Sequence, residues 1–200
     1  MKNTSGLFVT IVLFILAIVP AACSHASGKP SGPDITKAFN DISVCRNQAE
    51  SWIKSANSRF KEYEKKDEAL KAIEDAYSAA AARGNAFIET VQLNLTAKSL
   101  SKTQLEPYVS DVKTSIDKLK TTIDDEEKKM RNFLANSTDT KSFIGGLITS
   151  DIVEGAVVGL TKAGITIWQA AQKAKKEEIE DIKKELGKRR WQDWGQINPE

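Results

Sequence analysis

Apolar residues recur at alternating steps of three and four through most of this chain, and this spacing decides the fold class more than any other feature. One stripe runs from Ile35 to Tyr63, a second from Leu70 to Leu95, and a third from Leu105 to Phe133. Such spacing places apolar side chains on one face of an α-helix and is typical of helices that pack lengthwise. No segment shows the apolar-polar alternation of a strand. The sequence therefore predicts an all-α chain.

Polar segments separate the stripes. A charged turn spans residues 65–68, with Asp67 as the expected N-cap, and a second break spans residues 99–107, where Ser101 and Gln104 match a capping box. A further polar turn precedes a last periodic segment over residues 140–186. Short connections favour antiparallel neighbours. We expect an elongated antiparallel bundle of about four long helices, up-down-up-down, over residues 34–190, followed by a tail over residues 191–200.

The N-terminal segment has the features of a secretory signal. Lys2 precedes an uncharged apolar run from Leu7 to Val19, which ends before Pro20-Ala21-Ala22-Cys23. A membrane-spanning helix needs roughly 20 apolar residues, so this shorter run is typical of the apolar region of a signal peptide. We therefore expect residues 1–22 to be a signal peptide and the rest of the chain to act outside the cytoplasm.

The residues around Cys23 add an anchor to this prediction. Two alanines followed by cysteine resemble the lipobox of bacterial lipoproteins, and this resemblance implies that Cys23 carries lipid and becomes the first residue. Ser24, in place of the aspartate associated with inner-membrane retention, implies an outer-membrane lipoprotein facing the periplasm. Residues 23–33 then form a flexible Ser-Gly-Pro tether. The alternative is ordinary signal-peptidase cleavage near Ala26, which leaves a soluble periplasmic or secreted protein.

Composition argues against several classes of function. Of the 29 basic residues one is Lys2. Beyond the signal peptide the chain therefore has 28 basic and 27 acidic residues, a balance that argues against nucleic acid as a partner.

His25 is the single histidine and lies in the tether, so the helical body has no imidazole for acid-base catalysis or metal binding. Cys45 falls on an apolar stripe and is expected to be a buried, inert thiol. The acidic run at 124–127 is expected to lie on the surface. We therefore expect no enzyme, no cofactor, no metal and no small-molecule substrate.

Two glycine-containing regions allow close packing. Gly84 lies on the second stripe, where glycine costs about 1 kcal/mol relative to alanine, so it predicts the close approach of a neighbouring helix, with a kink as the alternative. Gly155, Gly159 and Gly164 lie in the apolar segment 143–171. This segment is expected to be a buried helix. The alternative, similar only in composition to α-helical pore-forming toxins, is a membrane-active segment that is released onto a bilayer.

Basic and aromatic residues meet near the C-terminus, at Arg189, Arg190, Trp191 and Trp194. Such a cluster suits lipid headgroups or a protein partner. For the two tryptophans, however, we favour the interpretation that both fold back over one end of the bundle. Taken together, these features predict a non-enzymatic lipoprotein that is attached to a membrane through its lipid and binds a protein partner as a scaffold, adaptor or immunity-like factor.

Overall fold

The computed structural model describes residues 32–136 and 151–198. All regular structure in these two stretches is helical, which confirms the predicted all-α class. The signal peptide, Cys23, most of the tether and the first part of the apolar segment, residues 143–150, lie outside them. The helices of the described stretches are α1 (Pro33–Phe60), α2 (Lys66–Leu93), α3 (Lys102–Asn136), α4 (Asp151–Gln172), α5 (Lys176–Gly187) and α6 (Trp194–Ile197).

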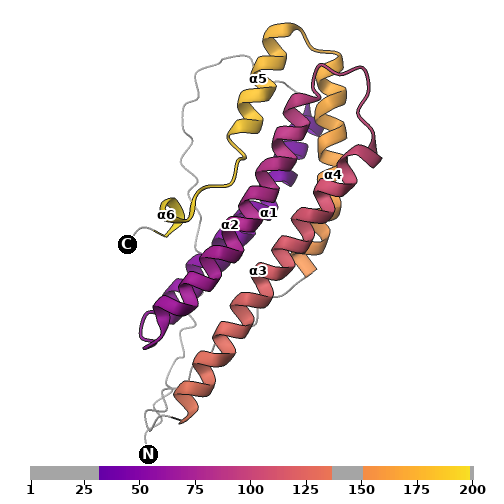
Figure 1. Cartoon of the computed structure of the whole chain (residues 1–200). Helices are drawn as coiled ribbons and strands as arrows, with labels where there is room; N and C mark the ends of the chain where they lie inside the picture. The colour runs from indigo at the N-terminus through magenta and orange to yellow at the C-terminus, as the bar shows by residue number, and fades with distance from the viewer. Residues whose placement is uncertain (1–31, 137–150, 199–200) are drawn as a thin grey trace, which may run out of the picture.

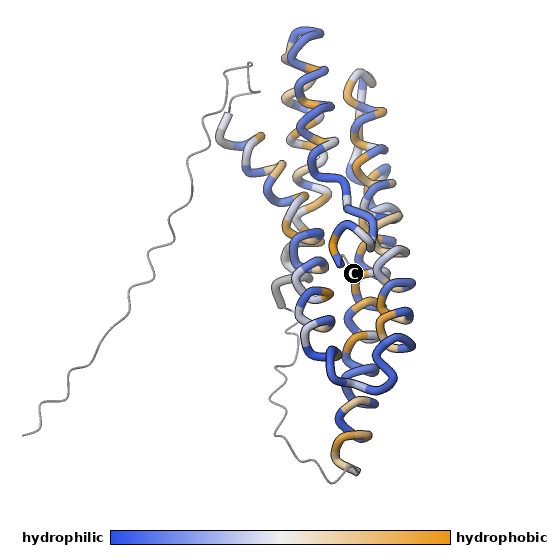
Figure 2. Tube along the Cα trace, turned by 90° about the vertical axis from the view of Figure 1, so that its left-hand side faces the viewer, coloured by the Kyte–Doolittle hydropathy of each residue, from blue (hydrophilic) through white to orange (hydrophobic). Residues whose placement is uncertain are grey.

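The four longest helices lie side by side (Figure 1). Helix α2 packs against α1 and α3, and α4 packs against α1 and α3. Hydrophobic and hydrophilic residues are interspersed along the whole length of the helices (Figure 2), and the predicted apolar stripes supply the core. Its fully buried large side chains include Ile53, Ile73, Phe87, Leu105 and Leu119. The periodicity of the sequence thus becomes one shared hydrophobic core.

The start of α3 follows the predicted capping box. Ser101 Oγ accepts a hydrogen bond from the Gln104 N–H at 3.3 Å, and Gln104 Oε1 accepts one from the Ser101 N–H at 2.8 Å. Both bonds satisfy amide groups that a helix start leaves without a partner. Asp67, in contrast, is not the N-cap of α2, because that helix already begins at Lys66. An acidic residue in this first turn still favours the positive end of the helix dipole.

The last periodic segment is two helices rather than one. Helix α4 ends at Gln172 and α5 begins at Lys176, where the Lys175 N–H donates to Glu178 Oε2 at 2.8 Å. A straight helix would carry Leu186 roughly 22 Å beyond Ala171, past the end of its neighbours. The turn instead brings α5 back against α2, where Ile182 and Leu186 are buried. Tertiary packing therefore overrides a local pattern that would allow one continuous helix.

The chain after α5 returns toward the α1–α2 turn (Figure 1). We call residues 188–198, which include the short helix α6, the C-terminal strap. Gln92 on α2 donates to the Lys183 carbonyl at 2.9 Å and so fixes α5 above the strap. The strap contacts α1 and α2 along its length, so residues 191–198 of the predicted tail are part of the folded body.

Candidate interaction site

Side chains of α1 and α2 bind the main chain of the C-terminal strap. Arg46 Nη1 donates to the carbonyls of Lys188 and Arg190 at 3.0 and 3.1 Å. The Tyr77 hydroxyl donates to the Gln192 carbonyl at 2.8 Å. Burial raises the pKa of the Tyr77 hydroxyl, so it stays protonated and remains a donor at any physiological pH. The strap is therefore fixed by specific polar contacts as well as by apolar burial.

The centre of the strap is Trp191, which packs directly on Gly84. The Trp191 N–H donates to Asn85 Oδ1 at 2.8 Å, and the indole lies against Tyr77 with 5.9 Å between the ring centroids. A Cβ atom at position 84 would come within 2.1 Å of Trp191 Nε1. Gly84 thus permits a close approach, as its place on the stripe predicted, but the approaching group is an indole of the strap rather than a neighbouring helix.

The four C-terminal residues predicted as a contact cluster are separated in the structure. Trp191 is 6% exposed, and Trp194 is partly buried beside Tyr77 with 6.3 Å between the ring centroids. The Arg189 guanidinium lies 5.2 Å from the centre of the Phe39 ring, whereas Arg190 points outward within 4.0 Å of Glu89. Trp191 covers the side of α2 rather than the end of the bundle. Of the four residues, Arg190 is exposed, Arg189 and Trp194 are partly exposed, and Trp191 is buried.

The three glycines of α4 do not share one face. Gly164 contacts the core, because a Cβ there would lie 2.8 Å from Leu105 Cδ1 and 3.3 Å from Val91 Cγ2. Within the described part of the chain, nothing lies within 4 Å of the positions where Gly155 and Gly159 would carry a Cβ. The helical repeat of 3.6 residues explains the difference, since residue 164 is two and a half turns from residue 155 and so lies on the opposite side.

Substituting Gly155 or Gly159 with alanine should therefore stabilise the protein. Each change adds a methyl group in open space and removes the conformational entropy cost of a mid-helix glycine, for a gain of about 0.5–1 kcal/mol. Chemical denaturation followed by circular dichroism measures the difference. A loss of stability at either position would show that a group outside the described stretches packs there.

The open side of α4 forms an apolar groove with the start of α3. Val158 is 77% exposed and lies in this groove of about 510 Å³ together with Ile165. The remaining lining residues are polar or charged: Lys102, Glu106, Thr161, Lys162, Thr166 and Gln169. A large, exposed apolar side chain in a groove with a charged rim is typical of a surface that binds another protein. We call this surface the α3–α4 groove.

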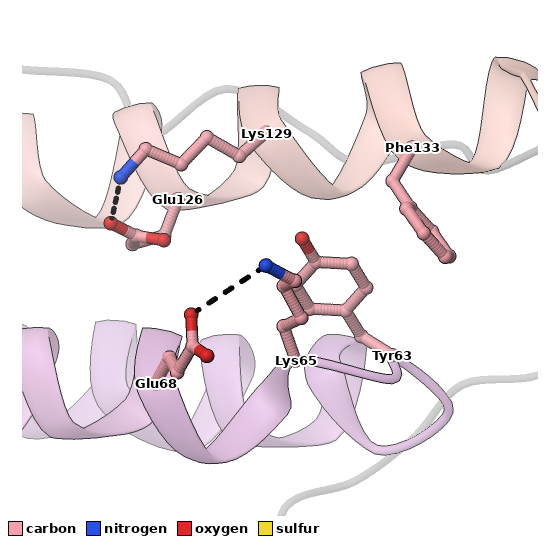
Figure 3. Close-up of a pocket in the computed structure, with 6 residues that line it drawn as sticks. All are labelled: Tyr63, Lys65, Glu68, Glu126, Lys129 and Phe133. Atoms are coloured by element: carbon pink, nitrogen blue, oxygen red, sulfur yellow. Dashed lines mark hydrogen bonds and ion pairs between the residues drawn. The ribbon is translucent and has the colours of Figure 1, made fainter.

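A second hollow, of about 480 Å³, lies between the α1–α2 turn and the C-terminal half of α3 (Figure 3). Lys65 and Glu68 form a long ion pair on one wall at 4.0 Å, and Lys129 binds Glu126 on the other at 2.6 Å. The rings of Tyr63 and Phe133 pack edge to face, and their centroids are 5.6 Å apart. Glu126 raises the pKa of the Lys129 ammonium by hydrogen bonding to it. Because each carboxylate is bound by its own lysine, the two acids do not converge on a common point.

The acidic run at 124–127 was expected to lie on the surface, but the structure buries part of it. Glu127 is only 3% exposed and accepts a hydrogen bond from Arg59 Nη2 on α1, while Arg131 Nη2 lies 3.6 Å from its other oxygen. Glu127 interrupts the apolar stripe of α3, because it lies one turn from Ile123 on the buried face. The run therefore contributes a buried ion pair between α1 and α3.

Burial in the core controls the chemistry of Cys45. Desolvation raises the pKa of the Cys45 thiol from 9.0 to about 12. At pH 8 the thiolate fraction is then about one in ten thousand, against about one in ten for an unperturbed thiol. We expect iodoacetamide to leave Cys45 unmodified in the folded protein and to alkylate it in urea, as mass spectrometry would measure. Rapid labelling of the native protein would contradict the buried position.

Within residues 32–136 and 151–198, no group of three or more histidine, cysteine, aspartate or glutamate side chains is placed to hold a metal ion. Among the helices of the same stretches, none combines the length and the apolar character that crossing a bilayer requires. No protein-family model, curated protein or solved structure matches this chain.

Proposed function

We propose that this protein is a non-enzymatic lipoprotein of the cell envelope, anchored in the outer membrane through Cys23, whose helical body faces the periplasm and binds a protein partner. In this proposal the four longest helices form an up-down-up-down bundle, and the tether over residues 23–33 sets how far the bundle stands from the membrane. The observation that supports partner binding is the α3–α4 groove with its exposed Val158.

The groove suits an amphipathic helix of the partner. The open positions of Gly155 and Gly159 flatten α4 beside Val158, so another helix can approach closely. Lys102, Glu106 and Lys162 on the rim supply both signs of charge for orienting polar contacts. Full burial of a valine side chain contributes about 1.5 kcal/mol or more, which is about a tenfold change in affinity.

Site-specific photo-crosslinking tests this proposal. A photoreactive amino acid at position 158 should capture a defined protein in intact cells, and the purified partner should bind the Val158→Asp variant about tenfold more weakly than the wild type. Leu93→Asp is the matched control, because Leu93 is 75% exposed but does not line the groove. Equal crosslinking from positions 158 and 93, or unchanged affinity of Val158→Asp, would contradict the groove as the binding surface.

The anchor has its own test. Mass spectrometry of the mature N-terminus should find a diacylglycerol-modified Cys23 as the first residue, and Cys23→Ser should release the protein from the outer-membrane fraction. An unmodified cysteine, or an N-terminus at Ser27, would instead support the soluble periplasmic or secreted alternative. Partner binding through the α3–α4 groove does not depend on which of these is found.

The same exposed Val158 favours a second candidate, a membrane-active role for segment 143–171. This role requires α4 to leave the core, where Val157, Leu160 and Ile167 are buried. Exposing each of these side chains to water costs about 1.5–3 kcal/mol. Insertion of α4 into a bilayer must therefore supply at least as much free energy. Leakage of dye from liposomes, abolished by Gly159→Asp in a folded variant, would support this role. We expect no leakage.

A further inference from the structure

The C-terminal strap forms one wall of an open pocket of about 820 Å³ over the α1–α2 turn, a volume within the range of about 300–1,000 Å³ that small-molecule sites occupy. Three segments supply its walls: the end of α1, the start of α2, and the strap. The lining residues are Asn57, Ser58, Lys61, Lys66, Asp67, Leu70, Lys71, Glu74, Trp194 and Asn198. We call this hollow the strap pocket.

One wall of the strap pocket combines an aromatic ring with amide groups. Trp194 is partly exposed there, and its contact with Tyr77 fixes the ring from another side. Asn57 Nδ2 donates to Asn198 Oδ1 at 2.8 Å, which leaves the carbonyl of Asn57 and the amino group of Asn198 available to a ligand. The Ser58 hydroxyl donates to the Lys54 carbonyl and can still accept a hydrogen bond. An aromatic face beside amides and hydroxyls matches the alternating apolar C–H and polar O–H surfaces of a sugar ring.

The charges of the strap pocket are only partly compensated. Lys71 lies 3.5 Å from Glu74 and 3.1 Å from Asp75, so its charge is balanced. Lys61 and Lys66 form no ion pair within the described stretches, and two ammonium groups are therefore available to anionic groups of a ligand. Asp67 also lines the pocket and would repel a compact anion such as phosphate, whereas it can accept hydrogen bonds from sugar hydroxyls.

We propose that the strap pocket binds an acidic oligosaccharide, with a sugar ring stacked on Trp194, carboxylate groups paired with Lys61 and Lys66, and hydroxyl groups bonded to Asp67 and the asparagines. This site is distinct from the α3–α4 groove. Because the strap provides Trp194 and Asn198, the bound sugar also favours the docked strap over any detached state, in proportion to its occupancy.

Isothermal titration calorimetry with tetragalacturonate as the probe tests this site on the purified full chain. We expect saturable binding that weakens as salt is added, because the lysine–carboxylate pairs lie at the surface. Trp194→Ala should weaken it at least tenfold and Trp194→Phe should largely restore it. Lys61→Gln combined with Lys66→Gln should also weaken it at least tenfold, whereas Lys113→Gln, an exposed lysine of α3 that lines neither the strap pocket nor the α3–α4 groove, should change nothing.

Two further ligands define the chemical class. Maltotetraose, a neutral sugar of the same length, should bind at least tenfold more weakly than tetragalacturonate, and inorganic phosphate should not compete. Absence of binding, equal affinity for the neutral sugar, full competition by phosphate, or unchanged affinity in the Lys61 and Lys66 double variant would each overturn the proposal. Thermal unfolding checks that every variant is folded, and the lysine variants remain decisive if Trp194→Ala loosens the strap.

Discussion

Glu127→Ala should lower the free energy of unfolding by about 3–5 kcal/mol, the usual cost of removing one partner of a buried ion pair. Glu127 is 3% exposed and joins Arg59 of α1 to α3, with Arg131 on its other oxygen. The substitution leaves the Arg59 guanidinium, which is largely buried, without its carboxylate. It also removes a contact between helices that are far apart in sequence. Urea unfolding followed by circular dichroism measures the loss.

Glu68→Ala provides the control for this prediction. Glu68 also forms an ion pair, with Lys65 at 4.0 Å, but both side chains are exposed. Its loss should therefore change stability by less than about 1 kcal/mol. The double substitution Arg59→Met with Glu127→Met should recover much of the stability lost in Glu127→Ala, because it replaces both charges with apolar groups. Similar effects of Glu127→Ala and Glu68→Ala would show that the Glu127 ion pair is not buried in solution.

The helical class and much of the core follow from the sequence because both depend on local spacing. Cys45 and Phe60 are buried as their positions on the stripe predict, and Ser101 with Gln104 caps α3. In each case the information lies within one or two helical turns. Predicting how the four longest helices are arranged requires information from distant parts of the chain, because the arrangement depends on which apolar faces meet.

Features that depend on distant segments were not predicted. The burial of Glu127 requires Arg59, which is 68 residues earlier, and the position of Trp191 requires Gly84 and Asn85 on another helix. The break between α4 and α5 arises because Leu186 is buried against α2 only if the chain turns. One signal was available for the strap, namely the costly glycine at position 84 on an otherwise apolar stripe. Nothing local identified the indole as its partner.

Gly84→Ala should destabilise the protein by about 2–4 kcal/mol, although alanine is the better helix former. The added Cβ would lie 2.1 Å from Trp191 Nε1 and 2.5 Å from Cε2, so the indole must leave its place. The variant then loses part of the burial of a large aromatic side chain, and overpacking alone costs about 1–3 kcal/mol. Denaturant unfolding measures the change, and a red shift of tryptophan fluorescence should accompany it.

The effect of Gly84→Ala should reverse its sign when Trp191 is absent. Trp191→Ala alone should cost about 3–5 kcal/mol. In that background the three atoms nearest to a Cβ at position 84, all of the Trp191 indole, are gone, and alanine should stabilise α2 by about 0.5–1 kcal/mol, as it should at Gly155. A double-mutant cycle therefore separates the steric contact from helix propensity. If Gly84→Ala is equally destabilising with and without Trp191, the close approach of the strap to α2 is not what requires glycine at this position.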